Sequence, residues 1–189
     1  MNNHLKFNIG NLSPLNLISF ILRTFVKDFN NYYKNKMYNC FDVAKKFLDI
    51  ASENNDGIDT MKLLKLTYIA HGYYLGFFDK PLFYDSIQAW KFGPVIPSLY
   101  HVIKPFGFGY VSPRVMSWHT ENKISKKDED FLRTIYKHYK KNTGVDLSNL
   151  THEEGTPWAQ VYQQGINNIP ISNSLIKEHY DRKIKSKTT

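Results

Sequence analysis

Residues 61–78 read MKLLKLTYIAHGYYLGFF, and this stretch decides the fold of the 189-residue chain. It contains no proline, and at 100° per residue its apolar side chains cover most of a helix circumference. A helix of this kind is normally surrounded by other helices. Asp59 or Thr60 is suited to cap its start, because a side-chain oxygen there accepts a hydrogen bond from a free backbone N–H. The stretch therefore predicts the central helix of a mainly α-helical, compact single-domain bundle.

One narrow strip of this helix differs from the rest. It holds Lys62, Lys65, Ile69, Gly72 and Gly76. Each glycine costs a helix about 1 kcal/mol relative to alanine and is favoured where another backbone or a partner comes close. Two interpretations remain open: the glycines pack on bulky neighbours near the helix end, or the strip headed by Lys65 is partly exposed as a contact surface.

Prolines and glycines divide the next part of the chain. The segment Asp79-Lys80-Pro81 ends the central helix, because the residue before a proline is pushed out of the α region. Gly93-Pro94 predicts a turn, and Pro97 is suited to the first position of a new helix. The loop-like residues 108–124 have room for a small β-hairpin. A helix should begin after Ser125, another at Pro157, and a last one should run toward Tyr180 after a turn at residues 167–170.

Four motifs follow in order along the chain: Cys40–Leu48, Met61–Gly72 with its Lys-Leu-x-Tyr element, Ala89–Val95 with Pro97 and Tyr100 behind it, and Thr151–Trp158, which reads Thr-His-x-x-Gly-x-Pro-Trp. Together they resemble the Panacea domain, also called the SocA-like antitoxin domain, which includes phage-associated GepA-like proteins. The resemblance implies a helical, cytoplasmic antitoxin of a bacterial or phage toxin–antitoxin pair, which neutralises its toxin by direct protein–protein contact. One branch of the family also implies a role as a proteolytic adaptor for a cytosolic AAA+ protease.

The expected partner-binding residues are Lys65, Gly72, Trp90, Lys91, Phe92, His152 and Glu153. Aromatic and cationic side chains near a tight turn make good interface anchors, which favours the group from Trp90 to Phe92. The alternative is that Trp90 and Phe92 belong to the core and Gly93-Pro94 only shapes the fold. No cofactor, metal site or catalytic residue is expected.

The domain organisation is predicted from where the resemblance begins and ends. Residues 37–180 form the Panacea-like domain, residues 1–36 an appendage with helical character, and residues 181–189 a basic tail. The apolar run Leu15–Val26 is too short and too polar to span a bilayer. It is interpreted as an extra docked helix, as a toxin-contacting arm, or as sequence upstream of a true start at Met37.

The net charge of +8 lies mainly at the two ends of the chain, since residues 37–176 carry only +1. A nucleic-acid-binding or regulatory accessory protein is the alternative function, because basic patches attract phosphates. The strongest candidate for such a patch is one helix face with Arg133, Lys137, Lys140 and Lys141. The same pattern is typical of a solvated amphipathic helix, which we favour.

An enzymatic function has little support in the residue pattern. The seven histidines show no compact metal-ligand spacing. His152 with Glu153 and Glu154 is the strongest acid–base candidate, although these residues equally suit a loop fixed by hydrogen bonds. Cys40 is the single cysteine, so no intramolecular disulfide is possible and the chain fits a reducing cytosol.

Overall fold

The computed structural model of the chain describes residues 37–186. Its elements are α2 (Cys40–Glu53), α3 (Thr60–Phe78), β1 (Gln88–Trp90), β2 (Gly93–Val95), α4 (Pro97–Ile103), the 3-10 helices η1 (Lys104–Phe106) and η2 (Pro113–Met116), α5 (Lys126–Tyr139), α6 (Gly144–His152), α7 (Pro157–Val161), β3 (Ile169–Pro170) and α8 (Asn173–Lys185). The fold is mainly α-helical, as predicted. The predicted helix within residues 1–36 lies outside the described residues.

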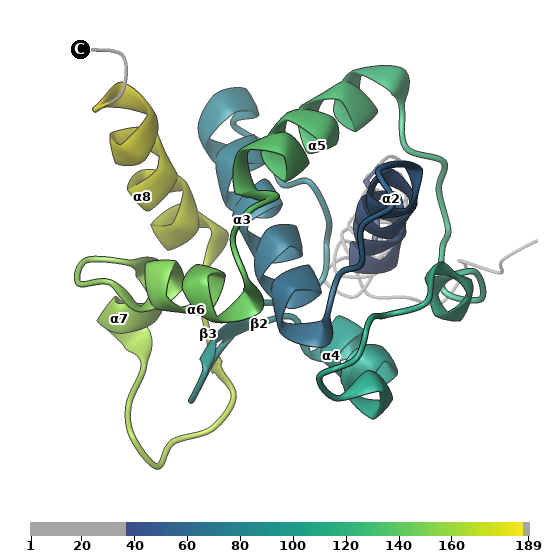
Figure 1. Cartoon of the computed structure of the whole chain (residues 1–189). Helices are drawn as coiled ribbons and strands as arrows, with labels where there is room; N and C mark the ends of the chain where they lie inside the picture. Colours follow the sequence, from purple (N-terminus) through teal and green to yellow (C-terminus); the bar gives the residue numbers. More distant parts are fainter. Residues whose placement is uncertain (1–36, 187–189) are drawn as a thin grey trace, which may run out of the picture. The chain divides into compact units, whose positions relative to one another are not determined.

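Helix α3 lies at the centre of this unit, with α2, α5, α6 and α8 packed around it (Figure 1). Every residue from Lys62 to Leu75 is buried, including both lysines. The Asp59 side chain caps the helix by accepting a hydrogen bond from the Lys62 backbone N–H. The prediction of a central, capped helix is confirmed.

The short helices begin where the sequence signals predicted. Pro97 occupies the first turn of α4, and the Ser125 hydroxyl accepts a hydrogen bond from the Asp128 N–H at the start of α5. Thr156 caps α7 in the same way, directly before Pro157. These local signals work because capping residues satisfy N–H groups that have no partner within the helix.

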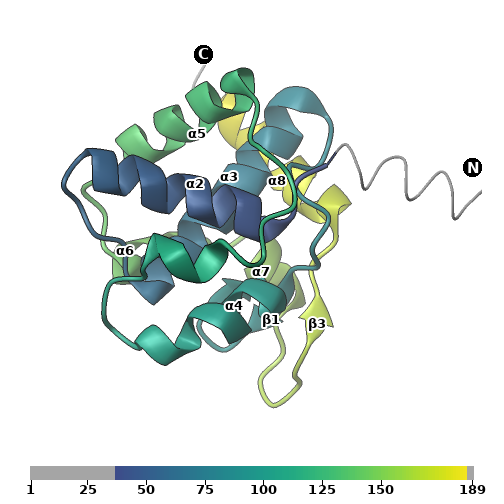
Figure 2. The same ribbon diagram turned by 90° about the vertical axis from the view of Figure 1, so that its right-hand side faces the viewer.

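The β-structure is not where the sequence placed it. Residues 108–124 contain η2 rather than a hairpin, and the hairpin is instead formed by β1 and β2, with Trp90 opposite Gly93. Ile169 of β3 pairs with Ala89 on the other edge of β1, so the predicted turn at residues 167–170 adds a third antiparallel strand (Figure 2). Strands of two or three residues are too short to show an alternating pattern.

The hypothesis of an exposed glycine strip on α3 is wrong, because α8 covers it. A Cβ atom on Gly72 would overlap the ring of Tyr180, and one on Gly76 would lie 2.7 Å from Ile184 Cδ1. Helix α8 continues to Lys185, past the predicted end near Tyr180, so the first residues assigned to a basic tail are helical. Within residues 37–186, no helix combines the length and apolarity needed to cross a bilayer.

Candidate functional site

The hairpin of β1 and β2 is held by side chains that bind its backbone carbonyl oxygens. From α3, the Nζ of Lys65 donates hydrogen bonds to the carbonyl oxygens of Phe92, at 2.6 Å, and of Pro94, at 3.1 Å. These two carbonyls lie on either side of Gly93. Lys65 therefore ties the turn of the hairpin to the central helix.

Helices α6 and α7 hold the same hairpin from a second direction. Ser148 Oγ donates to the Phe92 carbonyl at 3.3 Å, and Trp158 Nε1 donates to the Trp90 carbonyl at 2.8 Å. His152 packs its ring against Trp158, with centroids 4.0 Å apart, and places Nε2 3.5 Å from the Lys91 carbonyl. We call Lys65, Ser148, His152 and Trp158 the hairpin clamp.

Two residues of the hairpin clamp, Lys65 and His152, approach each other at Gly93. Its φ of 98° lies in the region that favours glycine. An added Cβ atom would overlap Lys65 Nζ and lie 2.9 Å from His152 Cε1. Three of the four sequence motifs thus meet at one backbone position, which explains why a lysine, a Gly-Pro turn and a Thr-His element occur together.

Lys65 is an unusual cation, since only 2% of its surface is exposed. Burial lowers the pKa of its ammonium group from 10.5 to about 7. Its hydrogen-bond acceptors are the backbone carbonyl oxygens of Phe92 and Pro94 in the hairpin. The hydrogen bonds of this ammonium group thus position the turn of the hairpin.

A groove of about 400 Å³ opens beside the hairpin, which is within the size range of binding pockets. Its apolar wall includes Leu64, Trp90, Phe92, Val95, Tyr100 and Phe108. The Trp90 and Tyr100 rings meet edge to face, with centroids 5.1 Å apart. Phe92 is 63% exposed and Phe108 is fully exposed. We call this the hairpin groove; large apolar side chains form much of its lining.

The structure brings together five of the seven predicted site residues. Trp90, Lys91 and Phe92 form the rim of the hairpin groove, Lys65 lies beneath the turn, and His152 belongs to the clamp. Of the two interpretations of the aromatic residues, Trp90 is partly buried and packs against the core, whereas Phe92 is exposed.

The other two predicted residues are neither clamp residues nor part of the groove lining. Gly72 is covered by Tyr180 and is not available to a partner in this structure. Glu153 is exposed and ends α6 directly after His152.

Sequence reasoning missed Phe108 and two clamp residues, Ser148 and Trp158, as site residues. A signal for Phe108 was present, because a large apolar residue between Gly107 and Gly109 belongs to no helical stripe. No local pattern marks Ser148, whose carbonyl partner is 56 residues away in the chain.

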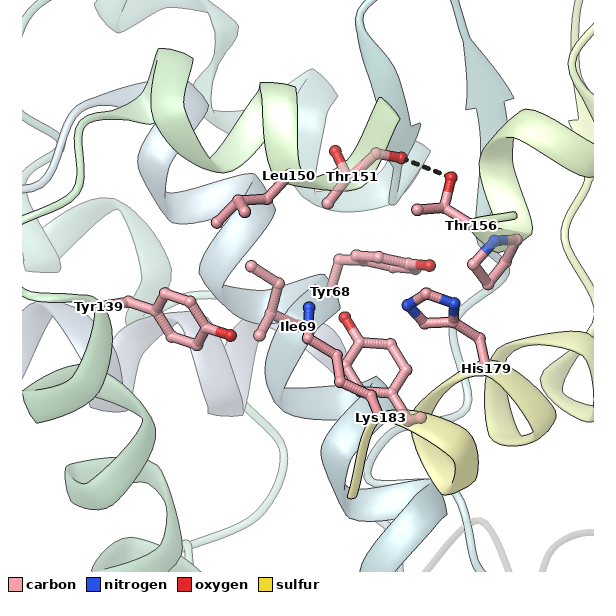
Figure 3. A pocket seen from close by; sticks show the side chains of 10 residues that line it. Tyr68, Ile69, Tyr139, Leu150, Thr151, Thr156, His179 and Lys183 are labelled. Carbon is pink, nitrogen blue, oxygen red and sulfur yellow. Dashed lines mark hydrogen bonds between the residues drawn. The ribbon is translucent and has the colours of Figure 1, made fainter. Parts of the chain in front are cut away.

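A second hollow lies between α3, α6 and α8 (Figure 3). Its lining includes Tyr68, Tyr139, Thr151, Thr156, His179 and Lys183, and the Thr156 hydroxyl donates to the Thr151 carbonyl at 3.0 Å. The cavity measures about 10 Å³, which is room for roughly one water molecule. It is too small for a substrate. Across residues 37–186, no three His, Cys, Asp or Glu side chains are grouped as metal ligands.

Comparison with known proteins identifies the relatives of this chain. The family model described as antitoxin SocA-like, Panacea domain, matches residues 63–159. The chain belongs to the SocA-like Panacea family. The match contains Lys65, the hairpin and Trp158, so the whole clamp lies within the Panacea region.

A curated relative of this Panacea protein is named Antitoxin SocA, from Caulobacter vibrioides (strain NA1000 / CB15N). It is 28% identical over 150 residues, which cover 73% of this chain and 80% of the relative. No solved structure matches the chain. The family model and this relative support an antitoxin family for the chain.

Proposed function

We propose that this Panacea protein is the antitoxin of a toxin–antitoxin pair and neutralises its toxin by direct binding. The observation that carries the proposal is the likeness to Antitoxin SocA over 80% of that protein's length. The hairpin groove agrees with a binding role, because exposed aromatic side chains beside a cation are typical interface anchors. The proposed contact residues are Trp90, Lys91 and Phe92, with Phe108 added.

Several finer assignments belong to the same proposal. The antitoxin acts in the cytoplasm without catalysis of its own, and delivery of the toxin to an AAA+ protease is a secondary route. Residues 37–180 are the toxin-binding domain, with residues 1–36 as an appendage and the last residues as a basic tail. His152 and Glu153 contribute near the contact: His152 by holding the hairpin, and Glu153 as an exposed neighbour.

The nucleic-acid alternative loses part of its basis. Arg133, the arginine on the basic face of α5, is paired with the carboxylates of Glu53 and Glu129, both at 2.7 Å. Those pairs occupy the guanidinium group that phosphate binding would need. No observation in the described residues favours this function over partner binding.

The test is co-expression of the full chain with the product of the neighbouring gene. Rescue of growth, together with co-purification of the two proteins, is the expected result. Failure to rescue, combined with binding to duplex DNA or RNA, would favour the nucleic-acid function instead. A Phe77→Ser variant is the control for the matching Phe92→Ser variant in the hairpin groove, because Phe77 is 56% exposed but lines a different groove.

A further inference from the structure

We infer that the hairpin groove binds a segment of the partner that carries large apolar side chains flanked by carboxylates. This inference rests on the proposed function, since it names the chemistry that the groove would select in a protein partner. It follows from two properties of the groove: the apolar area that it leaves exposed and the sign of the charges around it.

The apolar part is a continuous wall from three elements. Leu64 comes from α3, Val95 from β2 and Tyr100 from α4, while the exposed rings of Phe92 and Phe108 also line the groove. Exposed rings of this size are costly to leave in water and gain free energy when a partner covers them. The groove thus has room for a few large apolar side chains.

The charged residues that line the groove are Asp59, Lys65 and Lys91. Lys65 is buried, and its ammonium group donates to the carbonyl oxygens of the turn. Lys91 is exposed and holds its ammonium group 5.4 Å from the Phe92 ring. The exposed cation at this site favours an occupant with negative charge.

The acid lining the groove does not cancel this bias. Asp59 Oδ1 accepts a hydrogen bond from the Lys62 backbone N–H as the cap of α3, so its charge already interacts with the helix N-terminus. Lys62 itself is directed elsewhere and donates to the Lys140 carbonyl at 2.8 Å. Carboxylates on the partner would therefore meet Lys91.

A second exposed apolar groove supplies an internal control. It measures about 270 Å³, and no lysine, arginine or carboxylate lines it. Its lining residues are Tyr73, Phe77, Thr134, Ile135, His138, Tyr139 and Ile184. It offers apolar area without an exposed lysine. A ligand chosen for apolar area alone would bind both grooves, whereas an acidic ligand should prefer the hairpin groove.

The experiment is a titration of the full chain, labelled with ¹⁵N, with two matched 12-residue peptides. One has leucines flanked by glutamates, and the other has lysine at every glutamate position. The indole N–H of Trp90 reports on the groove, because Trp90 lines it and donates to Gln88 Oε1 at 2.9 Å. Trp118, an exposed indole outside the lining, is the reference signal.

We expect the acidic peptide to shift the Trp90 signal with a Kd at least tenfold lower than that of the basic peptide. Lys91→Glu should remove most of this preference, and Phe92→Ser should weaken binding at least tenfold. Phe77→Ser should leave both values unchanged. Equal affinities for the two peptides, or no shift of the Trp90 signal, would overturn the inference.

The same titration would also reveal either of two alternative occupants of the groove. A Trp90 signal that moves with protein concentration in the absence of peptide would mean that a second copy fills the groove. A Phe92→Ser exchange that alters the signals of residues 1–36 would mean that the chain's own leading segment does. Either result contradicts a partner segment as the occupant.

The outcome for the groove is independent of the outcome for the proposed function, because the titration requires no toxin. A chain that selects the acidic peptide but fails to protect cells would disprove the antitoxin function alone. A chain that protects cells, and does so equally well after Lys91→Glu and Phe92→Ser, would disprove the groove alone.

Discussion

The two halves of helix α3 pack against their neighbours in opposite ways. The first half carries Lys62 and Lys65, whose long side chains reach backbone carbonyls in other segments. The second half carries Gly72 and Gly76, where the missing side chains admit Tyr180 and Ile184 of α8. The first half thus holds the turn of the hairpin, and the second half packs closely against α8.

The contrast shows that a polar strip on a helix need not face water. A buried ammonium group is tolerated when carbonyl oxygens accept hydrogen bonds from it. A glycine is tolerated when a ring fills the space of its side chain. The following substitutions test each half separately.

The largest effect is expected from Gly72→Leu in the second half. The new side chain would overlap the Tyr180 ring, and overpacking of a core costs about 3 kcal/mol or more in such a case. Urea unfolding gives the free energy. In a Gly72→Leu/Tyr180→Ala double variant, the loss of unfolding free energy should be smaller than the sum of the losses in the two single variants. Strictly additive losses would contradict direct packing of the two residues.

The next effect concerns the pH dependence created by Lys65 in the first half. Its pKa is about 7 in the folded chain and 10.5 in the unfolded chain, so the unfolded chain binds more protons between these values. The contribution of Lys65 to the free energy of unfolding should therefore rise with pH, by about 2 kcal/mol between pH 7 and pH 9. Burial raises the pKa of the Cys40 thiol, which acts in the opposite direction toward pH 9. His71 titrates below this window, because burial lowers its pKa to about 4.

This dependence is measured by urea unfolding across that pH range. A Lys65→Met variant is the control, since it has no ammonium group to titrate at this position. If the wild-type chain and the variant showed the same slope, the titration of Lys65 would not be its source.

An effect of similar size on the free energy of unfolding is expected from Lys65→Met at constant pH. The variant leaves the Pro94 carbonyl without its side-chain donor, which should cost about 2 kcal/mol. Lys62→Met removes a single bond to the Lys140 carbonyl and should cost about 1 kcal/mol. Hydrogen exchange should show faster opening of the hairpin amides in the first variant only. An unchanged hairpin would show that the clamp is not needed to hold it.

The smallest effect on stability is expected at the tip of the hairpin. Phe92→Ser should change the free energy of unfolding by no more than about 0.5 kcal/mol, because the side chain is mostly exposed. Protection in the co-expression assay should nevertheless fall. Phe77→Ser should preserve protection, and a loss with both variants would indicate a general effect of exposed rings rather than a site.

The sequence predicted those parts of the fold that depend on neighbouring residues. The central helix, the Asp59 cap and Pro97 at the start of α4 are each encoded within a few positions. Strand β3 was missed, since its pairing joins Ala89 to a residue 80 positions later. The hairpin was misplaced although its pairing is local, because each of its strands has only three residues. Such pairing leaves no periodic signal in so short a segment.

The candidate site was predicted only in part, for a related reason. Trp90, Lys91 and Phe92 are recognisable from their turn, but the role of Lys65 is decided by a carbonyl 27 residues away. A lysine on a helix is ordinarily assigned to the surface. Sequence spacing therefore left a partly exposed Lys65 as one of two interpretations, whereas the fold supplies acceptors that keep it buried.

The hairpin clamp contacts the main-chain carbonyl oxygens of the hairpin. These contacts do not involve the side chains of Lys91 and Phe92. The scaffold is therefore indifferent to which amino acids occupy these two tip positions, while Lys65, Gly93 and Trp158 are fixed by geometry. An ancestral domain of this kind could change its recognition of an opponent by exchanging two residues, without any adjustment of the framework that displays them.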